Sequence, residues 1–177
     1  MSQPNFDSRI LSDDDFGIAQ LYLGNSSRIF SPDLVISPDG NPYLYRWHIT
    51  PRNLGANVYF HIQVADDPKR PLHNHPWDNM SVILSGGYKE VLCMSEGEPQ
   101  MGSVHSYVRN AGDTIYRRSG QSHRLEMQYG HPYTMTVFST GPKVRDWGFW
   151  YPQGFVPYEQ VTTTVDGVSV HIDKEGM

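Results

Sequence analysis

The sequence predicts an all-β protein, and three observations support this fold class. From Tyr43 onward, short apolar or alternating runs are broken by turn residues, and eight such runs fit in about 100 residues. Thirteen prolines, sixteen glycines and an aromatic content of 12% suit short strands joined by turns better than a helical bundle. A length of 177 residues fits one domain that can bury a sizeable core. We therefore expect a double-sheet jelly roll, which is a β-barrel of short strands.

The chain is expected to form a single domain over residues 1–177. Its barrel core spans about residues 42–140, between an N-terminal extension of residues 1–41 and a C-terminal segment of residues 141–177. The apolar and alternating runs predict strands at residues 43–49, 58–64, 80–84, 88–94, 103–109, 114–117, 123–128 and 134–139.

The N-terminal extension is mostly polar and contains one helix signal. Ser12, with Asp15 three residues later, predicts a cap for a short helix that starts near Asp13. Gly17 weakens this prediction, because glycine is a poor helix former.

Gly86 and Gly87 predict a two-residue hairpin turn, since adjacent glycines tolerate the positive φ that such a turn needs. In that register Ile83 faces Glu90 across the hairpin. Glu90 then shares a sheet face with Asn79.

The C-terminal segment contains two further patterns. Residues 141–157 are rich in aromatics and prolines, which indicates a fixed segment packed over the barrel. Residues 161–172 alternate around Asp166 and Gly167, which predicts a terminal hairpin. The unpaired edge of such a hairpin suggests a homodimer contact.

Charge and composition argue against several classes of protein. A net charge of −5 argues against a general nucleic-acid binder, for which a basic face is expected. There is no apolar run approaching about 18 residues and no basic-then-apolar leader, so we expect neither membrane insertion nor secretion. Cys93, as the lone cysteine, cannot form an internal disulfide, which agrees with a cytoplasmic location.

Three histidines carry the strongest chemical signal. His73 and His75 are two residues apart, so on a strand they leave the same face. His123 on a later strand can complete a facial set of metal ligands. First-row divalent metals favour imidazole, and a three-ligand face leaves positions open for substrate, water or O₂.

The segments around these histidines resemble the paired motifs of the cupin superfamily over residues 70–127. His73, His75 and Gly86 match the first motif, whereas Gly112, Gly120 and His123 match the second. Residues 42–61 and 140–149 are similar to an uncharacterised group of bacterial and phage cupins. The resemblance implies a cupin double-stranded β-helix that holds a divalent metal.

The chain departs from the cupin pattern at the fourth ligand. Asn79 and Met80 stand where the family's usual glutamate would lie, which leaves that ligand open. Glu90 has the correct face by the hairpin register and ranks slightly ahead of Asp78, which would need a bulge at Pro76 to turn inward. Asn79 would be a weak neutral donor, and a bare three-histidine site is equally open. Structural roles compete, because Asp78 suits a turn cap and Glu90 suits an ion pair with an arginine.

A cation is expected near the pocket. Arg117 and Arg118 alternate in direction on a strand, so one should point inward and hold a small anionic substrate, unless it forms a structural ion pair. Arg118 replaces the usual proline of the second cupin motif, and it is our catalytic candidate together with Tyr116. Trp77, Tyr88 and Tyr116 are expected pocket or core residues. The remaining histidines are interpreted as structural or surface residues; they are His48, His61, His105, His131 and His171.

The resemblance implies three classes of function. The first is a metal-dependent oxygenase that acts on a small polar or anionic metabolite, with Fe(II) favoured and Zn, Mn or Ni able to use the same ligands. The second is a non-catalytic or sugar-binding cupin, and the third is an isomerase or lyase that uses the metal as a Lewis acid. The fold alone does not select among them.

Overall fold

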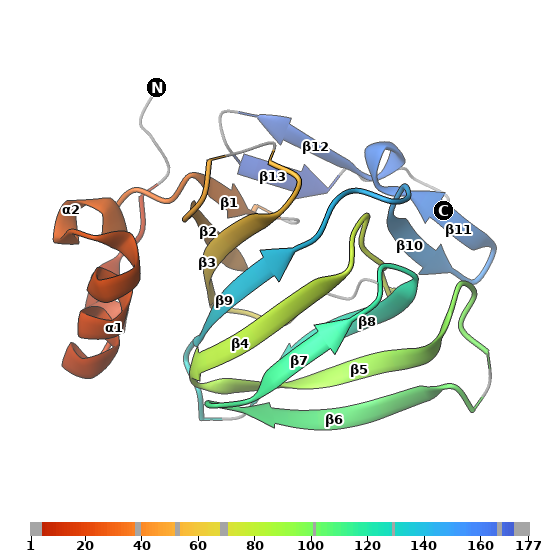
Figure 1. Cartoon of the computed structure of the whole chain (residues 1–177), viewed down its shortest axis with the longest axis horizontal. Helices are drawn as coiled ribbons and strands as arrows, with labels where there is room; N and C mark the ends of the chain where they lie inside the picture. The colour runs from red at the N-terminus through yellow and green to blue at the C-terminus, as the bar shows by residue number, and fades with distance from the viewer. Residues whose placement is uncertain are drawn as a thin grey trace.

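A computed structural model describes residues 5–37, 40–51, 54–67, 71–100, 102–128, 130–165 and 168–171, which are mostly β. Three short helices come first (Figure 1): η1 (Ser8–Ile10), α1 (Asp13–Leu23) and α2 (Ser26–Ile29). The strands that follow are β1 (Leu34–Ile36), β2 (Leu44–His48), β3 (Asn57–Gln63), β4 (Asn79–Ser85), β5 (Gly87–Glu96), β6 (Val104–Asn110), β7 (Thr114–Arg117), β8 (Gln121–Met127), β9 (Thr134–Thr140), β10 (Gly148–Tyr151), β11 (Gly154–Pro157), β12 (Thr162–Val165) and β13 (Val168–His171). A 3₁₀ helix, η2 (Tyr158–Gln160), precedes β12.

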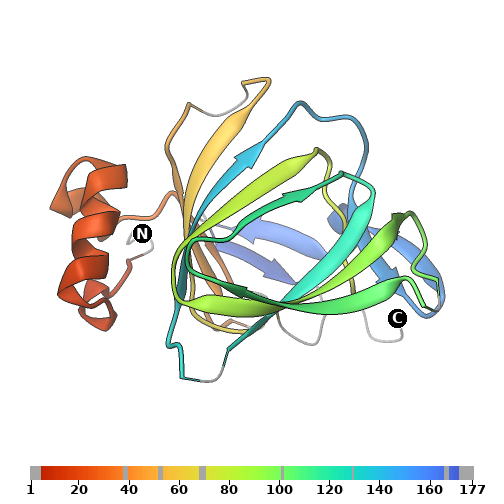
Figure 2. The same cartoon turned by 60° about the horizontal axis from the view of Figure 1, so that its bottom comes forward.

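The described strands form three sheets. The largest has the order β12-β13-β1-β2-β3-β9-β4-β7, and its pairs are antiparallel apart from the parallel pair β1–β13. A second sheet has the order β6-β5-β8, and β10 pairs with β11 in a third. Figure 2 shows β5 and β6 lying across from β4 and β9, and both larger sheets contribute residues to one cavity.

The eight strands predicted for the barrel core are confirmed as β2 to β9, and the strand at residues 114–117 has the predicted bounds. The terminal hairpin is confirmed by the pairing of β12 with β13, although its expected turn at Asp166 and Gly167 lies outside the described residues. The sequence did not predict β1 as a strand. It also did not predict β10 and β11 as strands within the aromatic segment.

The predicted N-terminal helix is also confirmed. Ser12 Oγ accepts a hydrogen bond from the backbone N–H of Asp15 at 3.2 Å, as an N-cap should. The helix α1 ends at Gly24, which has the left-handed conformation that glycine adopts without a steric penalty.

The predicted hairpin at Gly86 and Gly87 is wrong. Strand β4 pairs with β7 and β9, whereas β5 pairs with β6 and β8, so the two glycines carry the chain from one sheet to the other. Gly86 has φ of 72°, and a Cβ there would lie 2.3 Å from the carbonyl oxygen of Tyr133. A tight crossing thus needs glycine just as a tight turn does, and the two look alike in the sequence.

Strands β2 and β3 have one face against the helices and the other face toward the cavity. On one face, Trp47 and Phe60 are fully buried in an apolar cluster that includes residues of α1 and α2. Burying a side chain such as Phe60 contributes about 1.5–3 kcal/mol. On the opposite face, Arg46, His61 and Gln63 line the cavity inside the two sheets. The helices therefore cover the apolar face, and the polar face points inward.

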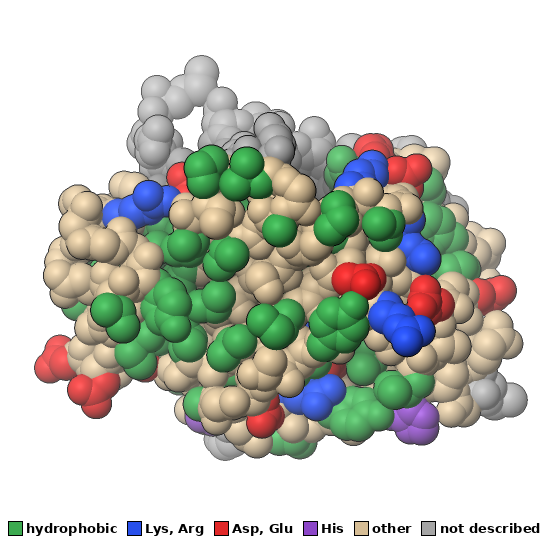
Figure 3. Space-filling model, in the orientation of Figure 1, with side chains coloured by type: hydrophobic (Ala, Val, Ile, Leu, Met, Phe, Trp, Pro, Cys, Tyr) green, Lys and Arg blue, Asp and Glu red, His purple; other side chains and the backbone are tan. Residues whose placement is uncertain are grey.

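The surface carries charges of both signs. On the face shown in Figure 3, apolar side chains are spread over the left and centre, basic and acidic side chains are interspersed on the right, and further acidic side chains lie at the lower left. None of the helices in the described ranges has the length and hydropathy needed to cross a membrane.

Candidate metal centre

The three predicted histidines meet in the structure. His123 lies on β8, and His73 forms an antiparallel bridge with it: each backbone N–H donates to the other's carbonyl oxygen, at 3.0 and 2.8 Å. His75 is held by a backbone hydrogen bond to Ser119. The metal-ligating atoms of the three imidazoles all lie within 4.8 Å of one another, so the group could hold a metal ion.

The closest pair of nitrogens has the spacing of two metal ligands. Nε2 of His75 lies 2.9 Å from Nε2 of His123. Two nitrogens that each lie about 2.0–2.1 Å from one metal and subtend a right angle are about 2.9 Å apart. The pair therefore suits neighbouring positions of an octahedral ion.

The protein keeps the imidazoles of His75 and His123 in the form that binds metal. Burial lowers the pKa of His75 well below 6.5, and the nearby His123 and His73 lower it further. Burial also lowers the pKa of His123, with a second contribution from the charge of Arg117. Neutral imidazoles carry a lone pair for a metal, whereas protonated ones repel it.

Glu90 on β5 is fully buried, and both of its oxygens have partners. Oε1 accepts a hydrogen bond from Nε of Arg117 and lies 3.0 Å from Nδ1 of His123. Oε2 accepts from Nε of Arg109 at 3.0 Å. Burial alone would raise the pKa of Glu90, but the His123 hydrogen bond and the charge of Arg117 lower it well below 4.5. The carboxylate is therefore ionised.

The contacts of Glu90 differ from the expectation that it supplies a metal ligand. An ionised carboxylate can only accept hydrogen bonds, so Nδ1 of His123 carries the proton and Nε2 presents its lone pair. Glu90 thus contacts a candidate ligand, His123, and lies outside the group of three histidines. A carboxylate behind a metal-binding histidine is a common arrangement. The alternative expected from the sequence was that Glu90 pairs with an arginine, and this is what its contacts with Arg117 and Arg109 show.

A second carboxylate, which the sequence analysis missed, lies beside His73. Oδ2 of Asp67 accepts the backbone N–H of Leu125 at 3.2 Å and lies 3.7 Å from Nδ1 of His73. Asp67 is buried, so its charge acts on His73 with little screening by solvent. Asp67 lies four residues after the end of β3, and no motif marks it in the sequence.

Neither alternative fourth ligand joins the cluster. Oδ2 of Asp78 accepts the hydroxyl of Tyr116 at 2.7 Å, and Oδ1 accepts the backbone N–H of Ser119 at 2.8 Å. Asp78 therefore holds the turn after β7, close to the structural role considered for it. Asn79 is buried, and its Oδ1 accepts from Nη1 of Arg117 at 3.3 Å. Among the described residues, the cluster consists of the three histidines alone.

The two catalytic candidates lie away from the cavity. The Arg118 side chain is 71% exposed and pairs with Glu96, and Tyr116 is 62% exposed. The inward arginine is Arg117, which is 1% exposed. The inward direction of the Arg117 side chain was predictable from the sequence. Ile115 and Arg117 share a face of the strand, and the apolar Ile115 belongs in the core. Arg117 contacts Glu90 rather than the cavity.

Aromatic side chains enclose the histidines. Trp77 stacks on His75 with 5.1 Å between ring centroids, and Trp147 stacks on it at 6.4 Å. Phe149 on β10 packs against His73, and the backbone of β10 bonds to the segment around His73. The aromatic C-terminal segment, expected to pack over the barrel, thus covers the histidine cluster.

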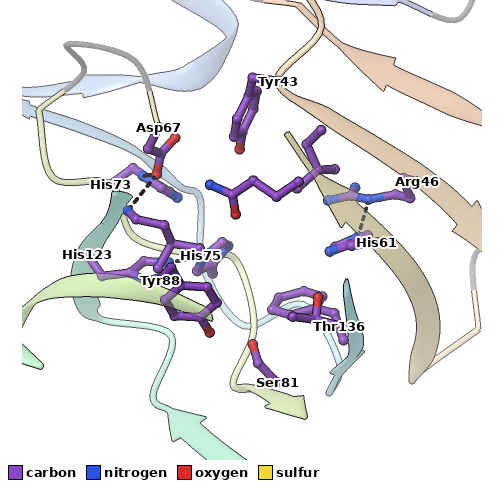
Figure 4. Close-up of a pocket in the computed structure, with 14 residues that line it drawn as sticks. Tyr43, Arg46, His61, Asp67, His73, His75, Ser81, Tyr88, His123 and Thr136 are labelled. Carbon is purple, nitrogen blue, oxygen red and sulfur yellow. Dashed lines mark hydrogen bonds and ion pairs between the residues drawn. The ribbon is translucent and has the colours of Figure 1, made fainter. Parts of the chain in front are cut away.

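The cluster opens on a cavity of about 70 Å³ lined by both sheets. Figure 4 shows His73, His75 and His123 on one side, with Arg46 and His61 on the other. His61 was interpreted as structural or surface, but it is buried in the cavity wall. Arg46 and His61 alternate with apolar residues in their strands. This alternation is the feature of the sequence that could have indicated that they share one face of the sheet.

No protein-family model matches the chain, and no curated protein matches it. Some solved structures are similar. Fe(II)-HppE with the alternative substrate (S)-1-HPP has 11% identity over 76% of this chain and 77% of its own, with a TM-score of 0.47. Hydroxypropylphosphonic acid epoxidase from S. wedmorenis has 12% identity over 75% and 76%, with a TM-score of 0.45. The DMSP lyase DddQ from Ruegeria pomeroyi DSS-3 has 18% identity over 67% and 57%, with a TM-score of 0.48.

Proposed function

We propose that this chain is a cupin-like metalloenzyme that uses His73, His75 and His123 to bind a divalent first-row metal, with Fe(II) favoured. The observation that carries the proposal is the 2.9 Å separation of two neutral Nε2 atoms inside a partly buried group of three imidazoles. Iron held in this way would keep positions open for a small substrate and for O₂. The proposed activity is oxygenation of a small polar or anionic metabolite.

The charges around the site support a small anion as substrate. Three neutral imidazoles leave the charge of a divalent metal uncompensated, whereas a carboxylate ligand would reduce it. The negative charge of Glu90 is shared by Arg117 and Arg109, so it offsets little of the metal's charge. An anion that enters the cavity is therefore attracted to the metal on the histidine side, and Asp67, which also lines the cavity, offsets part of this attraction.

The surrounding residues have defined roles in this proposal. Glu90 holds His123 with Nε2 toward the cavity. Asp67 lies 3.7 Å from Nδ1 of His73, so its interaction with this ring is electrostatic. Trp77 and Trp147 exclude water from the sides of His75, which strengthens the interaction of the site with charged ligands.

A second function is favoured by the same charge argument. An ion that keeps its full positive charge is a strong Lewis acid, and Zn held by three imidazoles would support lyase or isomerase chemistry without O₂. The two functions differ in their need for oxygen and for a redox-active metal.

The test compares the full chain loaded with Fe(II) or with Zn on a panel of small carboxylates and phosphonates. Oxygen uptake is followed with an electrode, and products are identified by NMR. Oxygen consumption with Fe(II) that is lost with Zn and in His123→Ala supports the oxygenase. Turnover with Zn under nitrogen supports the Lewis-acid enzyme. Unchanged uptake in His123→Ala would contradict a role for this site, and His105→Ala controls for the loss of an exposed imidazole.

A further inference from the structure

The cavity wall opposite the histidines is built from polar side chains of β2 and β3. In the antiparallel register Leu44 lies opposite Gln63, and Arg46 lies opposite His61, so these side chains share the inward face. His61 and Gln63 are both buried. Burying polar groups on an interior face costs free energy unless they find partners, so a polar interior wall is expected where a polar ligand binds.

The guanidinium of Arg46 is held in one orientation. Its Nε donates to Nε2 of His61 at 2.8 Å, and its carbon lies 4.8 Å from the centroid of the Tyr59 ring. His61 is fixed in turn by stacking against Tyr59 and Phe138, at 5.9 and 5.3 Å between centroids. Arginine carries five N–H donors in a planar fork, and His61 engages one of them. A fork oriented in this way suits bidentate binding of an oxyanion.

The charge of Arg46 acts on the histidine side of the same cavity. Arg46 and the three histidines line one cavity of about 70 Å³. Figure 4 shows the Arg46 side chain on the opposite side of the cavity from the histidines. A compact molecule can therefore contact both walls, with its anionic end at Arg46 and a second polar atom at the metal.

We infer that Arg46, positioned by His61 and Tyr59, binds the terminal oxyanion of the substrate, and that the substrate is a compact carboxylate or phosphonate with a second metal-binding oxygen. The inference rests on the proposed function for that second attachment, and it adds the residue that selects the substrate class. His61 is a positioning residue, because it acts through Arg46.

The experiment measures binding by calorimetry to the full chain, both Zn-loaded and metal-free. Glycolate and hydroxymethylphosphonate are the anionic probes, and ethylene glycol is the uncharged control of similar size. We expect the anionic probes to bind the wild type about tenfold to a hundredfold more tightly than ethylene glycol. Arg46→Gln should remove this preference, whereas Arg118→Gln, which removes an exposed arginine outside the cavity, should retain it. The tighter of the two anions identifies the oxyanion.

No preference for anions in the wild type, or an intact preference in Arg46→Gln, would overturn the inference. Arg46→Lys keeps the charge but loses the fork, so it should bind anions more weakly than the wild type; equal binding would also overturn it. Metal content is measured in the same samples. If the wild type holds no metal while the metal-free chain shows an Arg46-dependent preference, the proposed function fails and the anion site stands.

The positioning role of His61 has its own measurement. His61→Phe keeps an aromatic ring against Tyr59 and Phe138 but removes the acceptor for Arg46. We expect it to weaken binding of the anionic probes while binding of ethylene glycol is unchanged, and His61→Gln should recover part of the loss. Equal losses for charged and uncharged probes would show a merely structural role.

Discussion

Nδ1 of His123 lies 3.0 Å from Oε1 of Glu90, so the carboxylate expected to bind a metal instead orients the imidazole that would bind it. The same Oε1 accepts from Arg117, and Oε2 accepts from Arg109. The proton on Nδ1 leaves the lone pair of Nε2 directed toward His75. The geometry of the proposed centre therefore depends on a buried ion-pair network behind it.

Glu90→Gln should weaken metal binding by about 10- to 100-fold, because the amide is a poorer acceptor for His123 Nδ1–H. It should also destabilise the fold by about 3–5 kcal/mol, because two arginines lose a buried partner. Competition with a chelator gives the metal affinity, and urea denaturation gives the free energy of unfolding. Glu96→Gln, at an exposed site, is the control. Wild-type metal affinity in Glu90→Gln would contradict the positioning role.

The stability of the metal-free protein should fall as the pH drops below 6.5. Burial, followed by the charges of Arg46 and His48, lowers the pKa of His61 well below that value. Between the folded and unfolded pKa values the unfolded chain binds more protons, so lower pH favours unfolding, by up to about 1.4 kcal/mol per pH unit for this group. Denaturant titrations from pH 8 to 5 should show a shallower pH dependence in His61→Gln than in the wild type. The same slope in both would refute this, and exposed His131→Gln should match the wild type.

Metal binding should change the tryptophan fluorescence. Trp77 and Trp147 both stack on His75, so a paramagnetic ion such as Co(II) in the centre would lie close enough to quench them. A fluorescence titration should saturate at one ion per chain, and Trp77→Phe and Trp147→Phe should each reduce the change. Trp47→Phe should not, because Trp47 lies in the cluster beneath the helices. A response that survives in the Trp77, Trp147 double variant would place the ion elsewhere.

Gly86→Ala should destabilise the fold more than Gly97→Ala. Both glycines have positive φ, so both substitutions strain the backbone by about 1 kcal/mol. Only at Gly86 does the added Cβ meet backbone, at 2.3 Å from the Tyr133 oxygen, whereas Gly97 has nothing within 4 Å. The difference between their unfolding free energies in urea isolates the steric cost of the crossing. Equal losses would show that the crossing tolerates a side chain.

The strands and the capped helix could be predicted because they depend on local patterns. Alternation and turn residues located β2 to β9, and Ser12 located the start of α1. The roles of Glu90 and Arg117 depend on pairing between elements far apart in the sequence. Local patterns carry no such information, so the glycine pair between β4 and β5, Gly86 and Gly87, was interpreted as a turn.

Arg46 and His61 were missed for a different reason. Strands with one apolar and one polar face usually turn the polar face to solvent. In β2 and β3 the helices cover the apolar face, so Arg46 and His61 point inward instead. The choice between the two faces depended on where the N-terminal helices pack, which the alternation within the strands does not reveal.

Elemental analysis measures whether His73, His75 and His123 bind one metal ion per chain. The full chain is purified, loaded with Fe(II) or Zn, and desalted before measurement, together with a His75→Ala, His123→Ala double variant and a His105→Ala control. We predict close to one metal per chain in the wild type and the control, and loss of that metal in the double variant. Metal retained in the double variant, or absent from all three proteins after loading, would contradict the claim.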